Sequence, residues 1–177
     1  MNYLPRTIQP VIEEASKFFK IVMVSGMRQV GKSTLLKQLS SDKRTIISFD
    51  DISNLEAAKS APLQFLQLNP PPCFFDEVQR VPEIFRALKI IVDSRSDKGL
   101  YWLSGSQKLS LMSQVSDALP GRLMNFELWP FSIYEIAGKG LEQKPYLPSF
   151  SLSSSLPILA PEDTWNAVFQ GFWPELK

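Results

Sequence analysis

The sequence predicts a three-layer α/β fold in which helices cover both faces of a mostly parallel, five-stranded sheet. Short apolar runs alternate along the chain with helix-length amphipathic segments, which is typical of parallel sheets wrapped by helices. The first of these apolar runs leads directly into a glycine-containing loop and a helix-like segment. The 177 residues, 44% hydrophobic and 21% charged, are enough to bury one core.

The predicted strands are short apolar runs that end at polar residues or turn signals. They cover residues 20–25, 45–49, 72–76, 100–105 and 123–129. Between them, residues 81–95 are the clearest helix, because apolar side chains recur there at helical spacing. These apolar positions are Ile84, Leu88, Ile91 and Val92. Pro82 is expected in the first turn of this helix, where its missing N–H costs no hydrogen bond.

Four charged residues near the second and third strands each have two interpretations. Asp50 and Asp51 either face a ligand at the sheet edge or cap a helix that begins near Ser53, and we favour the cap. Arg80 and Arg86 either contact a polyanion or partner or are simply solvated, and we favour solvation.

Composition excludes several classes of protein. Nineteen Lys and Arg against eighteen Asp and Glu give a net charge of +1, so the overall basic charge of a dedicated nucleic-acid binder is missing. The chain has one cysteine, Cys73, and no histidine, which rules out an internal disulfide and argues against a zinc site. We see neither a signal peptide nor a membrane span, and we expect a cytoplasmic protein without a membrane partner.

A phosphate-binding loop is predicted within residues 25–36, which read SGMRQVGKSTLL and match the pattern G-x-x-x-x-G-K-[ST]. The backbone N–H groups of such a loop point at a phosphate, and the following helix adds its positive dipole end. We expect Lys32 to reach the β- and γ-phosphates and Ser33 to bind Mg²⁺, which Thr34 cannot do from the next helical face. The alternative is a glycine turn with a solvated lysine. The predicted nucleotide-binding residues are Gly26, Met27, Arg28, Gln29, Val30, Gly31, Lys32, Ser33 and Thr34.

Two adjacent carboxylates, Asp76 and Glu77, end the third predicted strand. We expect Asp76 to bind Mg²⁺ through a coordinated water, and Glu77 to polarise the water that attacks the γ-phosphate. Small-molecule kinases and GTPases generally lack the second carboxylate. The alternative is that one carboxylate caps a helix and the other is a surface acid. We favour the catalytic interpretation because a predicted phosphate loop lies upstream.

Polar groups on the remaining strands are candidate catalytic residues. The strand after Asp76 should insert beside the strand that carries the phosphate loop, and Ser104 or Ser106 at its end would then contact the γ-phosphate or the attacking water. Arg122, before the last strand, could neutralise transition-state charge in its own subunit or in a neighbour. A serine turn and a solvated or ion-paired arginine are the alternatives.

The predicted domain organisation changes after residue 138. Residues 139–163 are rich in Pro and Ser and predict a long loop or linker after a first domain of residues 1–138. Residues 164–177 then begin a truncated C-terminal domain, with Asp163 as a helix cap. Its aromatic residues either pack on the first domain or form an interface to a missing one. They are Trp165, Phe169, Phe172 and Trp173.

Together, the segments GMRQVGKSTLL, FFDEVQ, LSGSQ and LPGR followed by WPFSIYE resemble a family of predicted prokaryotic AAA-type ATPases. The resemblance covers roughly residues 5–138. It implies ATP and Mg²⁺ binding at Gly31, Lys32, Ser33 and Asp76, with Glu77 as the hydrolytic residue, and a following domain of unknown function. Arg28 and Gln29 belong to the loop pattern of that family without a role that we can assign.

The function that we predict is Mg²⁺-dependent ATP binding and hydrolysis that drives conformational change in a partner-binding protein. An ATP-controlled binding switch with negligible turnover is the first alternative. A small-molecule kinase with Arg122 as a lid residue is the second. The partner, a protein or DNA, would bind mainly through the missing C-terminal domain, and a homo-oligomer is possible.

Overall fold

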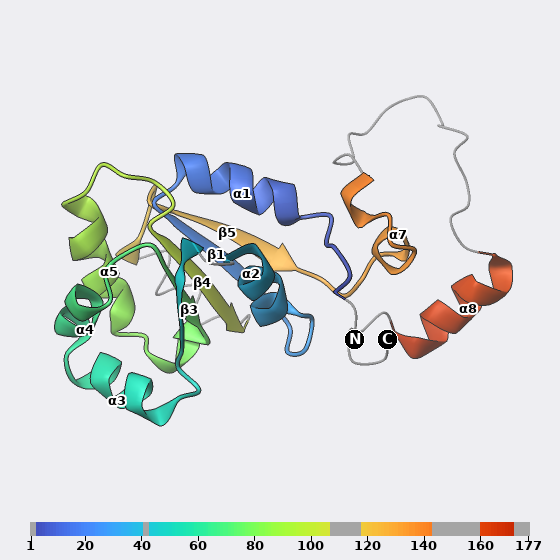
Figure 1. The fold of residues 1–177 in the computed structure, drawn as a ribbon. Coiled ribbons are helices and arrows are strands. Elements are labelled where there is room, and N and C mark those ends of the chain that lie inside the picture. The colour runs from blue at the N-terminus through green and yellow to red at the C-terminus, as the bar shows by residue number, and fades with distance from the viewer. Residues whose placement is uncertain (1–2, 41–42, 107–117, 143–159, 172–177) are drawn as a thin grey trace. The chain divides into compact units, whose positions relative to one another are not determined.

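The computed structural model describes residues 3–40, 43–106, 118–142 and 160–171 (Figure 1). The chain divides into two compact units, one of residues 11–129 and one of the residues before 11 and after 129. None of the described helices is long and apolar enough to cross a membrane.

The larger unit contains a five-stranded sheet in the order β2-β3-β4-β1-β5, and every strand pair in it is parallel (Figure 1). The prediction that the strand after Asp76 inserts beside the loop-bearing strand is confirmed, because β4 lies between β3 and β1. All five predicted strands form, each within one or two residues of its predicted ends. They are β1 (Ile21–Gly26), β2 (Thr45–Ser48), β3 (Cys73–Asp76), β4 (Tyr101–Ser106) and β5 (Leu123–Leu128).

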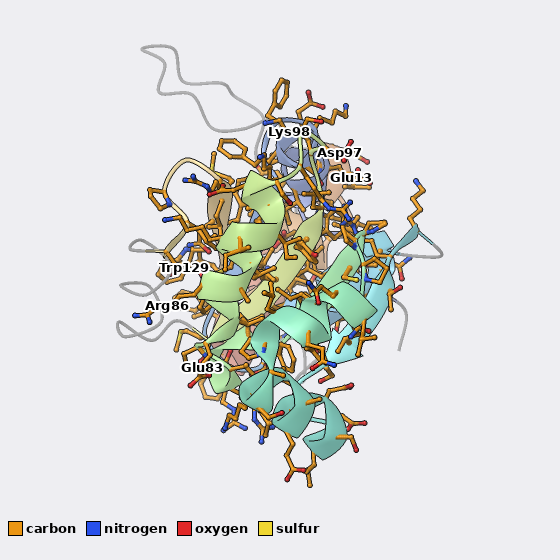
Figure 2. The ribbon with its side chains drawn as sticks, turned by 90° about the vertical axis from the view of Figure 1, so that its left-hand side faces the viewer. Glu13, Glu83, Arg86, Asp97, Lys98 and Trp129 are labelled. Carbon is orange, nitrogen blue, oxygen red and sulfur yellow. The ribbon has the colours of Figure 1, made fainter. Side chains whose placement is uncertain are left out.

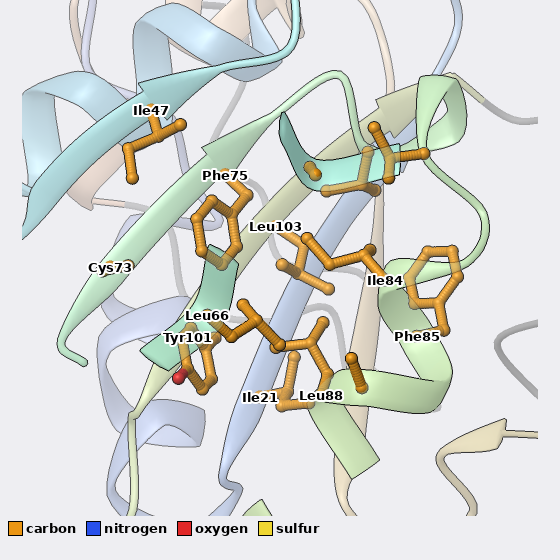
Figure 3. Close-up of a cluster of buried hydrophobic side chains, with 14 of the residues drawn as sticks. Ile21, Ile47, Leu66, Cys73, Phe75, Ile84, Phe85, Leu88, Tyr101 and Leu103 are labelled. Carbon is orange, nitrogen blue, oxygen red and sulfur yellow. The ribbon is translucent and has the colours of Figure 1, made fainter. Parts of the chain in front are cut away.

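One face of the sheet is covered by α3 (Ile52–Ser60), α4 (Pro62–Leu68) and α5 (Ile84–Asp93). Alternate strand residues point to this face and meet apolar side chains of the three helices, such as Leu66 and Leu88 (Figure 3). Aromatic rings run across it: the Phe75 ring stacks on Phe49, with centroids 5.7 Å apart, and on Tyr101, with centroids 5.6 Å apart. This packing holds β3 and β4 against the helices, and the carboxyl ends of these two strands carry the candidate site.

The opposite face is covered by α1 (Gln9–Phe18) and α2 (Lys32–Ser40). Trp102 on β4 donates its indole N–H to the Ser16 hydroxyl of α1 at 2.9 Å, and the Arg44 guanidinium lies 4.1 Å from the centre of a Trp102 ring. Ser33 of α2 contacts Asp76 on β3. Helices on both faces make the predicted three-layer fold.

The segment between β3 and α5 corrects two predictions. A short 3₁₀ helix, η2 (Val78–Arg80), follows Glu77, and α5 then begins at Ile84, so Pro82 lies before the first turn rather than in it. Arg80 is not simply solvated, because its guanidinium pairs with the Asp50 carboxylate. Arg86 is exposed on the outer side of α5, as predicted (Figure 2).

Asp51 caps α3, as predicted, whereas Asp50 does not. The Asp51 Oδ1 atom accepts from the backbone N–H groups of Ser53 at 2.8 Å and Asn54 at 3.3 Å. Asp51→Ala should therefore lower the free energy of unfolding by about 1 kcal/mol. Asp50→Ala is the matched control, because an exposed ion pair contributes little. Thermal or denaturant unfolding of both variants tests this, and an equal loss in the two variants would contradict the assignment of the cap.

In the smaller unit, a buried ion pair joins the N-terminal segment to α7 (Ile133–Ile136). Glu135 Oε1 accepts from Arg6 Nε at 3.1 Å and from the Thr7 N–H at 2.8 Å. Its Oε2 accepts from the Ser132 N–H at 2.8 Å and completes a capping box, since the Ser132 hydroxyl accepts from the Glu135 N–H. Arg6 also lies 4.5 Å from the centre of the Phe131 ring. Arg6 and Glu135 therefore satisfy each other's charge out of water.

The predicted linker and C-terminal start fall partly outside the described residues. Residues 143–159 and 172–177, including Phe172 and Trp173, are not described. The helix η3 (Gly140–Glu142) and the start of α8 (Pro161–Gln170) lie inside the predicted linker. Asp163 is not a cap, because α8 begins two residues earlier, at Pro161. Trp165, Val168 and Phe169 are exposed on α8.

Candidate functional site

The loop of residues 27–31 joins the carboxyl end of β1 to the first turn of α2, and its backbone is tightly wrapped. Gly26, Gln29 and Gly31 have φ angles of 151°, 65° and 91°. A Cβ atom on Gly26 would lie 2.4 Å from the carbonyl oxygen of Leu128 on β5, so only glycine fits there. Gln29 holds a left-handed conformation that costs a non-glycine residue about 1–3 kcal/mol, and such conformations cluster at ligand-binding loops.

Lys32, the first residue of α2, folds back over this loop. Its side chain is buried, and its Nζ donates to the carbonyl oxygens of Gly26 at 3.1 Å and Met27 at 2.7 Å. Burial lowers the pKa of Lys32 below its ordinary value, while Glu77 and Asp76 act in the opposite direction and Arg28 lowers it further. The ammonium is thus held at the loop by neutral carbonyls, and it would gain from a nearby phosphate anion.

Asp76, at the end of β3, is the centre of the polar cluster. It is 4% exposed, and its Oδ1 accepts from the Ser33 hydroxyl at 2.6 Å and also from the Ser104 hydroxyl. Lys37 Nζ lies 4.0 Å from Oδ2. Sequence reasoning missed Lys37, although it follows Ser33 by four residues and so shares its helix face.

Glu77 has an unusual backbone and two anchors. Its φ and ψ of 61° and 44° are left-handed, and its N–H donates to the Ser104 hydroxyl at 3.2 Å. Its Oε2 accepts from the side-chain amide of Gln79, whose Oε1 accepts from the Ser106 N–H at 3.1 Å. The Ser104 hydroxyl therefore joins the Asp76 carboxylate to the backbone N–H of Glu77, and Gln79, which contacts the Glu77 carboxylate, is a residue that sequence reasoning missed.

Ser104 and Ser106 differ in their surroundings. The Ser104 hydroxyl contacts both carboxylate-bearing residues, Asp76 and Glu77. The Ser106 hydroxyl is buried and has no hydrogen-bond partner in the described part of the chain, and Ser106 contributes a backbone N–H instead. Of the two serines, Ser104 is thus the one whose hydroxyl can position a neighbouring group.

Arg122 is not brought to this cluster. It precedes β5, and the register pairs Ile21 at the start of β1 with Leu123, so Arg122 lies at the edge of the sheet opposite to the phosphate loop. The six residues of β5 rise about 3.3 Å each, which puts Arg122 roughly 20 Å from that loop. There its guanidinium pairs with Asp93, and this pair raises the pKa of Arg122 and lowers that of Asp93. This distance argues against a role in its own subunit, and a role in a neighbour stays a prediction.

The donor set of the cluster suits a hard cation better than a soft one. Ser33 and Asp76 offer oxygen atoms side by side. Among the described residues, no three His, Cys, Asp or Glu gather into a metal site. Mg²⁺ fits such a poor set of ligands, because it usually keeps waters and takes one or two carboxylates together with substrate phosphates.

The wrapped loop, the buried lysine and the paired acids at the carboxyl edge of a parallel sheet define a nucleotide-binding P-loop domain. A family model described as AAA domain matches residues 18–137, and the chain belongs to this family. AAA domains generally bind nucleotide and act as ATPases. The match includes every residue of the polar cluster.

Two longer proteins are similar to this chain, and both are uncharacterized. One comes from Mycobacterium bovis and the other from Mycobacterium tuberculosis. Each is 27% identical over 155 residues, which is 84% of this chain and 35% of the relative. The chain thus spans about a third of the length of these curated relatives.

Proposed function

We propose that the chain binds ATP with Mg²⁺ and hydrolyses it, and that hydrolysis drives conformational change in a longer, partner-binding protein. The observation that carries the proposal is the connected cluster of Ser33, Asp76, Ser104 and Glu77 beside the phosphate loop. A binding loop alone would account for nucleotide affinity. A carboxylate held beside it by its own contacts supports hydrolysis as well.

In this proposal, the backbone of residues 26–34 cradles the phosphates while Lys32 exchanges its carbonyl partners for β- and γ-phosphate oxygens. Ser33 and Asp76 would hold Mg²⁺, which neutralises charge on the phosphate oxygens when bound. Glu77 takes a proton from the attacking water, and the Ser104 hydroxyl fixes the backbone from which Glu77 extends. The partner, a protein or DNA, and any homo-oligomer belong to the longer protein, where Arg122 could act on a neighbour.

Phosphate release without any added acceptor tests this function. The chain should release phosphate from ATP with Mg²⁺ and should lose that activity in excess EDTA, with full recovery when Mg²⁺ is restored. ATP binding measured in parallel by calorimetry separates the alternatives. Binding without turnover favours the switch. Formation of ADP and a phosphorylated acceptor, only when a hydroxyl acceptor is added and without release of free phosphate, favours a kinase. No binding at all would defeat the proposal.

A further inference from the structure

Gln79 connects two parts of the site that are far apart in the sequence. It lies in η2, two residues after Glu77, and it is partly buried. Its amide N–H₂ donates to Glu77 Oε2, and its amide oxygen accepts from the N–H of Ser106 at the end of β4 at 3.1 Å. Both ends of the side chain are therefore engaged, one on the carboxylate and one on the neighbouring strand.

The contacts close a ring of hydrogen bonds between the ends of β3 and β4. On one side, the Ser104 hydroxyl bridges Asp76 and the Glu77 N–H. On the other, Gln79 bridges the Glu77 carboxylate and the Ser106 N–H. Ser104 fixes the backbone of Glu77, but a glutamate side chain has rotatable bonds of its own, and only the Gln79 contact restrains its carboxylate among the contacts recorded for the described residues.

We infer that Gln79 is a positioning residue that aims the Glu77 carboxylate at the attacking water. The inference rests on the proposed ATPase function and deepens it. A general base is commonly held in position by a further residue, just as a catalytic histidine is oriented by a neighbouring hydrogen-bond partner. Here that group must donate to a carboxylate at one end and accept from a backbone N–H at the other, and a side-chain amide does both.

The chemistry of this bridge predicts which substitutions fail. Gln79→Met keeps the approximate length and removes both hydrogen bonds. Gln79→Glu keeps the acceptor for Ser106 but replaces the donor by a second negative charge beside Glu77. Outer-shell groups that orient metal ligands are typically worth about 10–100-fold in activity, and we expect a group that orients a general base to fall in the same range. Both variants should therefore lower kcat by about 10- to 100-fold, with ATP affinity within about threefold of the parent, because Gln79 does not lie on the phosphate loop.

The test measures phosphate release and calorimetric ATP affinity for the parent, Gln79→Met, Gln79→Glu, Glu77→Gln and the double variant that combines Gln79→Met with Glu77→Gln. Gln64→Met, on an exposed position of α4, is the control and should change neither quantity. If Gln79 acts through Glu77, Gln79→Met should not slow the Glu77→Gln variant any further. A purely structural role would slow both backgrounds by the same factor and weaken ATP binding.

The outcomes separate this inference from the proposed function. If the parent hydrolyses ATP, Glu77→Gln hydrolyses it far more slowly, and Gln79→Met hydrolyses it at the parental rate, the positioning role is overturned and the ATPase stands. Equal slowing of both backgrounds overturns it as well. If the parent releases no phosphate, the proposed function fails and the positioning role fails with it.

Discussion

Glu77→Gln should leave Mg²⁺-dependent ATP binding intact and slow hydrolysis by about 10²- to 10⁴-fold, the usual range for loss of a general base. Glutamine keeps the size of the side chain and can still bond to the Gln79 amide, but it cannot take a proton from water. The backbone anchor is unchanged, because the Glu77 N–H to Ser104 bond does not involve the side chain. The variant therefore removes the proton acceptor without dismantling the site.

Asp76→Asn is the comparison that makes this result specific. Asp76 accepts hydrogen bonds from both Ser33 and Ser104. The uncharged amide of the asparagine should disturb these hydrogen bonds and weaken Mg²⁺-dependent ATP binding itself. Calorimetry and phosphate release on both variants distinguish the roles. Hydrolysis by Glu77→Gln at the parental rate would show that Glu77 is not the base. Loss of binding in both variants would show that the two acids share one task.

The central strands of the sheet could be predicted because each is a short apolar run that is buried on both faces, whereas the edge strands β2 and β5 are only partly buried. In β1 and β3 every residue is buried, so the hydrophobic runs themselves mark the strands. The position of β4 was predicted from the class of P-loop fold that a second carboxylate at position 77 indicates, and the structure confirms it. The first and last residues of the helices were harder to predict. The αL turn at Glu77 and the helix η2 move the start of α5 beyond Pro82, and no periodicity reports such a turn.

The phosphate loop could be predicted because its residues are contiguous and their spacing follows from backbone geometry. Contacts between segments that are far apart in the sequence could not be predicted. Gln79 meets Ser106 across 27 positions, and Arg80 meets Asp50 across 30. Arg122, in contrast, was predicted to be catalytic and is not near the site. An arginine side chain is suited to neutralising phosphate charge, but the register of β5 places Arg122 at the opposite end of the strands from the phosphate loop, beside Asp93.

Lys32→Ala should lower ATP affinity by about 10²- to 10⁴-fold. The estimate takes two charge-assisted hydrogen bonds to phosphate at roughly 1.5–3 kcal/mol each. In the free chain the Lys32 ammonium is buried, and within the described ranges it hydrogen-bonds only to the carbonyls of Gly26 and Met27, so phosphate oxygens would be its first anionic hydrogen-bond partners. Calorimetry with Mg²⁺ present measures the loss. Lys59→Ala, an exposed lysine on α3, is the control and should bind ATP as the parent does.

The pH dependence gives the same residue a second, independent signature. Burial lowers the pKa of Lys32 below its ordinary value of 10.5, so its ammonium loses the proton at a lower pH than an exposed lysine does. ATP affinity in the parent should therefore fall as pH rises through that lowered pKa, and the fall should be absent in Lys32→Ala. The stability of the free chain should change in the opposite direction. The unfolded state binds more protons between the two pKa values, so the contribution of Lys32 to the free energy of unfolding rises with pH there. If Lys32→Ala remains folded and binds ATP with unchanged affinity, Lys32 does not bind phosphate. Residues 26–34 would then be a glycine turn with a lysine that has no role in nucleotide binding.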